Sequence, residues 1–249
     1  MNFKIQMSGL KKQFGSNPVL HGVDLEISSD TITAIIGKSG SGKSVLLKLI
    51  AGIYSLDVGT IDCVHILESG ETVPIALSEI GFSYMFQNNA LFDSLTAFEN
   101  VALPLSEGKL KVDPSTIRNT VDDLFEQLDL SSARNRFPGE LSGGMNKRVA
   151  FARALVTQPK VVLFDEPTTG LDPERKFTVF DMIERYREQF GFSALLVSHD
   201  IPDVYAIVDS IAWLDQGKIQ FLGTSQEIDS ITEVATKNYL KTGRFVGKS

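Results

Sequence analysis

An apolar run over residues 32–36 leads directly into a loop rich in glycine and serine, and a helical pattern begins where the loop ends. The loop has the sequence Gly37-Lys38-Ser39-Gly40-Ser41-Gly42-Lys43-Ser44. A strand, such a loop and a helix in succession bind phosphate groups, because glycine lets backbone N–H groups turn inward and the helix N-terminus adds the positive end of its dipole. We expect a nucleoside triphosphate here, with Lys43 reaching its β and γ phosphates and the Ser44 hydroxyl binding Mg²⁺.

The composition is that of a globular chain with one large core, or one core and a small added lobe: 249 residues, 43% of them hydrophobic. A net charge of −7 argues against broad binding to nucleic acid or to an anionic membrane surface by charge alone. Cys63 is the only cysteine, so no intrachain disulfide can form, which fits a reducing compartment. No segment has the roughly 20 apolar residues that cross a bilayer, and no secretory signal opens the chain. Any work at a membrane therefore needs a span from another chain.

Alternating apolar residues predict an antiparallel edge sheet beside the phosphate loop. The alternation at the N-terminus and over residues 23–27 predicts two short strands before the loop. Further strands are predicted over residues 59–64 and 80–86, on either side of a turn-prone segment at 68–71.

Residues 88–159 have a helical pattern with few strand signals. Asp113 and Pro114 predict the N-cap and the first position of a helix. Its expected apolar face consists of Ile117, Val121, Leu124, Phe125 and Leu128. Aliphatic runs over residues 161–164 and 194–197 are then typical of buried parallel strands, with a charged amphipathic helix near 174–190 between them.

The last part of the chain predicts a hairpin, a helix and a tail. Residues 211–214 and 219–222 form the expected hairpin, with a turn at 215–218. Thr224 and Glu227 have the spacing of a capping box and predict another helix. The polar residues 237–249 are predicted to be a frayed tail, with the alternative that they grip a neighbouring copy of the chain.

Five further motifs accompany the phosphate loop and, with one exception, follow it in the chain. They are Phe14, Gln87, Leu141-Ser142-Gly143-Gly144-Met145, the run Val161-Val162-Leu163-Phe164-Asp165-Glu166-Pro167-Thr168-Thr169-Gly170-Leu171-Asp172-Pro173, and His199. In this order they resemble the ATP-binding-cassette ATPases, over nearly the whole chain. The resemblance implies an α/β fold: a P-loop NTPase (RecA-like) core with an antiparallel β subdomain and an inserted α-helical subdomain. It implies one domain, with residues 1–87 and 160–236 as core and β subdomain, 88–159 as the helical subdomain with the signature motif, and 237–249 as a tail.

The resemblance also implies a role for each polar residue near the phosphates. Asp165 belongs to the Mg²⁺ shell and Glu166 polarises the attacking water, although an acidic pair after a strand is also typical of a helix cap or a solvated loop. Gln87 contacts Mg²⁺ or the water. His199 contacts the γ-phosphate and holds the water with Glu166, where the alternative is a structural or surface histidine.

Further implied roles concern the base and a second copy of the chain. Phe14 stacks on adenine, unless it packs in the core. Ser142, Gly143 and Gly144 meet the γ-phosphate held by the second copy, unless they only begin a helix. Asp172 links the two sites across a dimer and is also a candidate N-cap. The resemblance thus implies a dimer with two ATP molecules between its protomers.

Residues 86–105 resemble the ATPases of MCE-protein lipid transporters, such as the bacterial Mla phospholipid system and its chloroplast relative. Met145, where cassette ATPases usually have Gln, agrees with this interpretation. It implies as partners a transmembrane permease, an MCE lipid-binding protein and optionally a STAS-domain subunit, at the cytoplasmic face of the inner membrane. Four apolar residues either form an exposed groove for the permease or pack inside: Leu91, Phe92, Leu95 and Phe98.

Three alternatives to a lipid-transport ATPase stay open. The first is the ATPase of another importer or exporter, for amino acids, metals or other solutes. The second is a soluble cassette ATPase acting on DNA or ribosomes, which the single cassette, the lack of a heptad array and the acidic balance disfavour. The third is a regulatory module without turnover, which the presence of Asp165, Glu166 and His199 disfavours.

Overall fold

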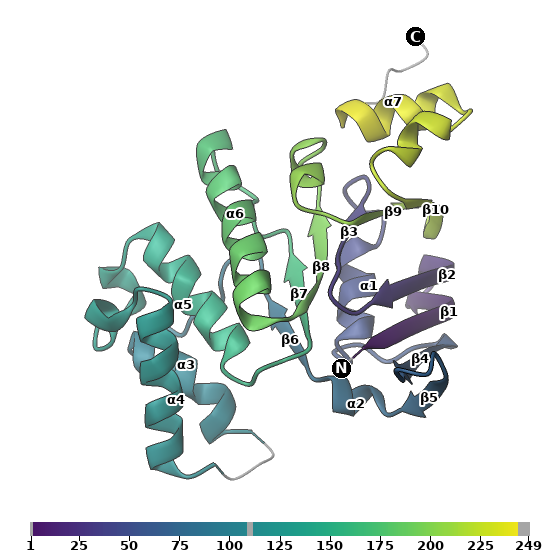
Figure 1. Ribbon diagram of the computed structural model, residues 1–249. Helices are drawn as coiled ribbons and strands as arrows, with labels where there is room; N and C mark the ends of the chain where they lie inside the picture. Colours follow the sequence, from purple (N-terminus) through teal and green to yellow (C-terminus); the bar gives the residue numbers. More distant parts are fainter. Residues whose placement is uncertain (1, 109–111, 244–249) are drawn as a thin grey trace.

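The strands form two sheets in the computed structural model, which describes residues 2–108 and 112–243 (Figure 1). The larger sheet has the order β10-β9-β3-β8-β7-β6. Its members are β3 (Ile32–Ile36), β6 (Phe82–Met85), β7 (Val161–Asp165), β8 (Ser193–Ser198), β9 (Ser210–Asp215) and β10 (Lys218–Gly223). All pairs are parallel except the β9–β10 hairpin, so β3, β6, β7 and β8 end at the same edge of the sheet.

The inner strands β3, β7 and β8 of the larger sheet are buried along their whole length, which explains their continuous aliphatic runs. In β7, Val162 and Phe164 face one apolar core while Val161 and Leu163 face the other. The same alternation occurs in β8, because successive side chains of a strand point to opposite faces. The predictions of buried parallel strands at 161–164 and 194–197 are therefore confirmed.

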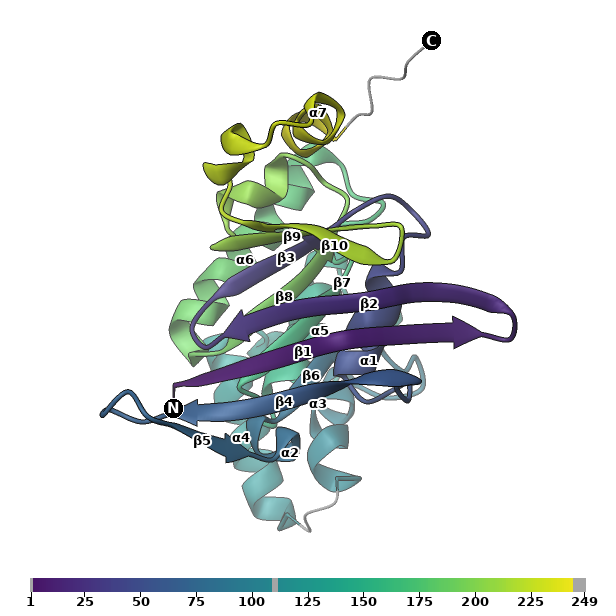
Figure 2. The same cartoon turned by 90° about the vertical axis from the view of Figure 1, so that its right-hand side faces the viewer.

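A four-stranded antiparallel sheet and helix α1 (Lys43–Ile50) cover one face. Figure 2 shows β1, β2 and β4 side by side, with α1 behind them. The strands are β1 (Phe3–Phe14), β2 (Asn17–Ser28), β4 (Val58–Ile66) and β5 (Thr72–Ile75). The first two strands are 12 residues long, so the prediction of short strands was wrong. The pairing of β1 with both β2 and β4 continues along this length despite several register shifts, and no local pattern reveals it.

The predicted strand near 80–86 belongs to the other sheet. A short helix, α2 (Leu77–Ile80), precedes β6, and β6 pairs in parallel with β7. In the smaller sheet β4 lies between β1 and β5, and β5 was not predicted. The assignment of residues 80–86 to the antiparallel sheet was wrong because the partner strand of β6 lies far along the chain and leaves no local signal.

Helices cover the other face of the larger sheet. They are α3 (Ala97–Ser106), α4 (Pro114–Gln127), α5 (Gly143–Leu155) and α6 (Pro173–Phe190), with short 3-10 turns η1 (Ser131–Ala133) and η2 (Pro138–Glu140). Asp113 caps α4 by accepting bonds from the N–H groups of Ser115 and Thr116, as predicted.

Among the described residues, the helices lack the length and apolar character that a membrane span requires. The subdomain boundaries at 87–88 and 159–160 stay a prediction.

The C-terminal residues differ from the expected tail. The β9–β10 hairpin is confirmed, and the backbone N–H of Thr224 donates to the carboxylate of Glu227 at 2.7 Å. These two residues introduce only a 3-10 turn, η4 (Glu227–Ser230), instead of the predicted helix. A second 3-10 turn, η3 (Asp203–Ala206), follows β8. Helix α7 (Val234–Thr242) then lies at the opposite end of the molecule from α3 and α4 (Figures 1 and 2).

Residues 237–242 are therefore helical, and the prediction of a frayed tail from 237 was wrong for them. Tyr239 and Leu240 are buried against the main core. Two apolar residues in a short polar segment do not by themselves predict a buried helix. The core against which they pack is formed by residues that are distant in the sequence. The rest of the predicted tail, at 244–249, lies outside the described residues.

Candidate functional site

The phosphate loop is shaped by two glycines at its ends. A Cβ atom on Gly37 would lie 2.2 Å from the carbonyl oxygen of Leu214 in β9, so only glycine fits there. Gly42 has a φ of +102°, and a Cβ atom on it would lie 2.8 Å from Leu20. Between them, Lys38, Ser39 and Gly40 are exposed, so the backbone of the loop is open to a ligand.

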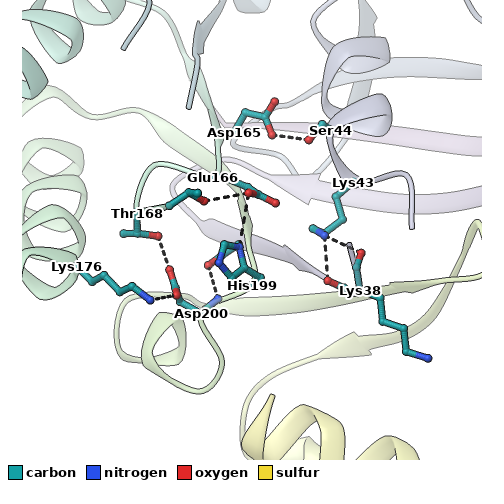
Figure 3. A network of polar contacts seen from close by, with 12 residues as sticks. Lys38, Lys43, Ser44, Asp165, Glu166, Thr168, Lys176, His199 and Asp200 are labelled. Carbon is teal, nitrogen blue, oxygen red and sulfur yellow. Dashed lines mark hydrogen bonds and ion pairs between the residues drawn. The ribbon is translucent and has the colours of Figure 1, made fainter. Parts of the chain in front are cut away.

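Lys43 is buried across this loop at the start of α1. Its Nζ atom donates to the carbonyl oxygens of Gly37 and Lys38, each at 2.9 Å (Figure 3). Burial lowers the pKa of Lys43, and the nearby charges of Glu166 and Asp165 partly oppose that shift. The Oγ atom of Ser41 is also buried, and it has no hydrogen-bond partner among the residues that the structure describes.

Asp165 ends β7 beside the start of α1 and is 8% exposed. Its Oδ1 atom accepts a bond of 2.7 Å from the hydroxyl of Ser44, and its Oδ2 atom accepts one of 2.6 Å from the hydroxyl of Tyr84 in β6. Burial and the contact with Asp165 raise the pKa of Tyr84. The Ser44 hydroxyl and the Asp165 carboxylate offer adjacent hard oxygen donors, which fits the ligand preference of Mg²⁺.

Glu166 follows in a left-handed backbone conformation, with φ of +51°. Its N–H group donates to the carbonyl of Val197 in β8 at 3.0 Å, which joins the ends of the two strands. Its Oε2 atom accepts a bond of 3.0 Å from the hydroxyl of Thr169, and Nδ1 of His199 lies 3.6 Å from the same atom (Figure 3). Such a conformation costs energy for a residue with a Cβ atom, so the surrounding contacts must hold Glu166 in place.

A buried carboxylate that sequence reasoning missed lies beside His199. Asp200 is 6% exposed, forms an ion pair with Lys176 of α6, and accepts a hydrogen bond from the hydroxyl of Thr168. Its N–H group donates to the hydroxyl of Ser198 at 3.0 Å. This cluster ties the loop that carries His199 to the loop between β7 and α6. Its only sequence signal is an acidic residue directly after the histidine.

Gln87 and the signature residues line a different region. Gln87 is exposed two residues after β6, and it lines a hollow of about 590 Å³ together with Ser142, Gly143 and Gly144. Ser142 is the N-cap of α5 and accepts a bond from the N–H of Met145. The expectation of a helix start here is confirmed, and the predicted contact with a second copy stays a prediction.

Two other predicted residues lie at the ends of elements. Phe14 ends β1 with 44% of its surface exposed, and its ring meets that of Tyr54 edge to face at 5.3 Å. It is therefore not a core residue, and stacking on adenine stays a prediction. Asp172 caps α6 by accepting a bond of 3.0 Å from the N–H of Arg175, so the alternative role as N-cap is confirmed.

The apolar residues considered for a docking groove divide between the two interpretations. Leu91 and Phe98 are partly buried against the main core. Phe92 is 51% exposed and lines a surface hollow with Phe86 and Arg153. Leu95 has intermediate exposure. This hollow lies along β6 and α5.

A phosphate loop after one strand of a parallel sheet and an acidic pair after another define a nucleotide-binding cassette with the P-loop fold. Residues 20–169 match the model of the ABC transporter family, and the chain belongs to this family. The predicted fold class and the resemblance to the ATP-binding-cassette ATPases are confirmed. The resemblance of residues 86–105 to lipid-transport ATPases stays a prediction.

Several relatives are named as ATP-binding proteins of import or transport systems. The chain is 34% identical over 227 residues to the Fe(3+) ions import ATP-binding protein FbpC of Vibrio cholerae serotype O1, a match that covers 91% of this chain and 63% of that protein. It is 35% identical over 236 residues to the sulfate/thiosulfate import ATP-binding protein CysA of Caulobacter vibrioides, covering 93% and 68%. It is 33% identical over 249 residues to the probable ribonucleotide transport ATP-binding protein mkl of Mycobacterium leprae, covering 99% and 71%.

A solved structure has the same fold. It is the dimeric post-hydrolysis state of the ATP-binding cassette MJ0796 bound to ADP and Pi. The TM-score is 0.69 at 27% identity, and the match covers 88% of this chain and 98% of that one.

Proposed function

We propose that the chain is the ATP-hydrolysing subunit of an ABC transporter and works as a pair of copies that enclose two ATP molecules. The observation that carries this proposal is the meeting of Ser44, Asp165, Glu166 and His199 at the carboxyl edge of one parallel sheet. Ligands of open α/β sheets bind at this edge.

The binding of ATP follows from the loop and the residues around it. Backbone N–H groups of residues 38–43 and the N-terminus of α1 attract the phosphates, and Lys43 adds a positive charge. Lys43 exchanges its contacts with the carbonyls of Gly37 and Lys38 for contacts with phosphate oxygens. The exposed ring of Phe14 offers a surface on which the adenine stacks.

Ser44 and Asp165 hold Mg²⁺, with Gln87 as a further candidate on a more distant loop. The bound ion supplies positive charge that offsets the charge of the β and γ phosphates. The Ser44 hydroxyl donates to Oδ1 of Asp165 at 2.7 Å, so these two proposed ligands already lie side by side.

Glu166 orients the attacking water and accepts its proton, as ATP and water become ADP and phosphate. Its Oε2 atom is within reach of both Thr169 and His199, so these residues fix the direction of the carboxylate. His199 is 49% exposed in its side chain and is thus accessible to the γ-phosphate.

The second copy contributes the signature residues. Ser142, Gly143 and Gly144 are exposed at the N-terminus of α5, where N–H groups attract anions. The dimeric state of MJ0796 supports a pair of copies. ATP favours the closed pair because its γ-phosphate is shared between the copies, and hydrolysis removes that contact.

For the cargo we propose import of a solute, through a permease that this chain drives. The names of FbpC and CysA support this alternative better than they support lipid transport. The lipid interpretation, with an MCE protein, a STAS-domain subunit and a place at the inner membrane, rests on residues 86–105 and Met145. Both interpretations need a permease, for which the hollow beside Phe86 and Phe92 is the candidate docking region.

The proposal is tested by purifying the tagged chain in detergent from its native host. ATP binding and hydrolysis by the purified complex support the assignment, and their absence contradicts it. Co-purification of a permease with a solute-binding protein supports import of a solute. Co-purification of a permease with an MCE protein contradicts it in favour of lipid transport.

A further inference from the structure

One contact at the site is made by a residue with no role so far. Tyr84 lies in β6, at the edge of the larger sheet, and its hydroxyl donates to Oδ2 of Asp165 at 2.6 Å. Ser44 donates to the other oxygen, Oδ1, at 2.7 Å. Each oxygen of this nearly buried carboxylate thus accepts a bond from a different element, β6 on one side and α1 on the other.

The position of Tyr84 in the strand does not require a hydroxyl group. The backbone of β6 pairs with β7 in a register that places Tyr84 opposite Leu163, and this pairing is independent of side chains. The ring of Tyr84 packs against Phe86 with a centroid distance of 4.5 Å, which a phenylalanine would also do. The oxygen atom is therefore the part of Tyr84 that is specific to Asp165.

We propose that Tyr84 is a positioning residue for the Mg²⁺ carboxylate of Asp165. The inference rests on the proposed function and adds to it a residue that sets the affinity for the ion. Ser44 cannot orient the Asp165 carboxylate alone, because its hydroxyl is itself a proposed ligand of the ion. Its bond to Oδ1 therefore changes when the ion binds. Tyr84 occupies the other oxygen and keeps the carboxylate oriented in both states.

The expected effect on Mg²⁺ affinity comes from the conformational entropy that the Asp165 carboxylate loses when it binds the ion. A carboxylate held by a hydrogen bond loses less conformational freedom when it binds a cation, and such supporting contacts typically change metal affinity by about 10- to 100-fold.

The test compares the full-length wild-type chain with Tyr84→Phe. Calorimetric titration with ADP, which is not hydrolysed, gives the Kd in EDTA and across a series of Mg²⁺ concentrations. We expect Tyr84→Phe to raise the Mg²⁺ concentration of half-maximal effect by about 10-fold. The Kd for ADP in EDTA should match the wild type, since the phosphate loop is untouched.

Tyr205→Phe is the matched control. The hydroxyl of Tyr205 donates to the carbonyl of Leu240 at 2.6 Å, so this variant loses a tyrosine hydrogen bond of the same length away from Asp165. It should leave the Mg²⁺ dependence unchanged. If Tyr84→Phe does not fold, Tyr84→Met takes its place, since methionine also lacks the hydroxyl and its flexible side chain adapts to the space left by the ring.

Two outcomes would overturn the proposal. One is a Mg²⁺ dependence of the Tyr84 variant within twofold of the wild type. The other is an equal loss of ADP affinity with and without Mg²⁺, because Tyr84 would then act through the strand and not through Asp165. Failure of the wild-type chain to bind nucleotide in any condition would instead overturn the proposed function. The wild-type titration is done first, so this outcome is distinguished from a failure of the Tyr84 proposal.

Discussion

Nδ1 of His199 lies 3.6 Å from Oε2 of Glu166, and the two residues follow neighbouring parallel strands. The N–H of Glu166 also bonds the carbonyl of Val197, two residues before His199. The acidic residue and the histidine therefore belong to one rigid junction between the ends of β7 and β8. This junction gives Glu166 a fixed direction even without a ligand.

Replacement of Glu166 by Gln should stop turnover while ATP still binds. Glutamine keeps the size of the side chain and an oxygen for the Thr169 hydroxyl, but it cannot accept the proton of the water. Phosphate release should fall on the order of 100-fold or more. Size-exclusion chromatography with Mg·ATP should show more of the paired form, since the shared γ-phosphate persists.

Glu174→Gln is the control for the loss of a charge near this junction. Glu174 is exposed in the first turn of α6 and contacts none of the site residues discussed above. Its turnover should equal that of the wild type. Near-normal turnover of the Glu166 variant in the purified complex would remove Glu166 from the catalytic role.

Replacement of Lys43 by Ala should weaken ATP binding strongly. The ammonium is already held over the phosphate loop by the carbonyls of Gly37 and Lys38, so little ordering is needed when phosphates arrive. We expect the Kd for ATP to rise by on the order of 100-fold, as for the loss of a charged, buried contact. Equilibrium dialysis measures the change, and Lys48→Ala, on the next turn of α1, is the control. Unchanged affinity would overturn the phosphate-loop assignment.

Much of this site was predictable because its parts are local in sequence. The phosphate loop, the buried strand before Asp165 and the N-cap at Asp172 each depend on neighbouring residues, and the structure has them where they were expected. The fold class followed from the resemblance of these motifs, in their order, to the ATP-binding-cassette ATPases. The sheet to which β6 belongs was not predictable, because its pairing with β7 joins segments far apart in the chain.

The missed residues also depend on distant contacts. Tyr84 is an ordinary aromatic residue in a strand until β6 lies beside Asp165. Lys176 belongs to a charged helix face, and only the packing of α6 brings it to Asp200. Long-range ion pairs and hydrogen bonds of this kind have no periodicity that a single sequence reveals.

Replacement of Lys176 by Met should destabilise the fold. Asp200 would remain buried with the hydroxyl of Thr168 but without a cation, since its side chain is only 3% exposed. The free energy of unfolding should fall by about 3 kcal/mol. Urea denaturation followed by circular dichroism measures this change. Lys241→Met, which removes the exposed partner of Asp229, is the control and should leave the midpoint unchanged. Equal midpoints for both variants would show that the buried pair adds no stability.

Replacement of Ser142 by Ala should lower turnover of the paired form without affecting ATP binding by a single copy. The serine caps α5, so part of the effect is a loss of about 1 kcal/mol of stability. Thr96→Ala removes the cap of α3, whose bond to Glu99 has the same length of 3.2 Å as that of Ser142 to Met145. It is therefore the matched control for cap loss alone. If both variants lose turnover equally, Ser142 acts only as a cap. If Ser142→Ala weakens ATP binding by the isolated monomer, the prediction that Ser142 contacts the nucleotide held by the second copy is wrong.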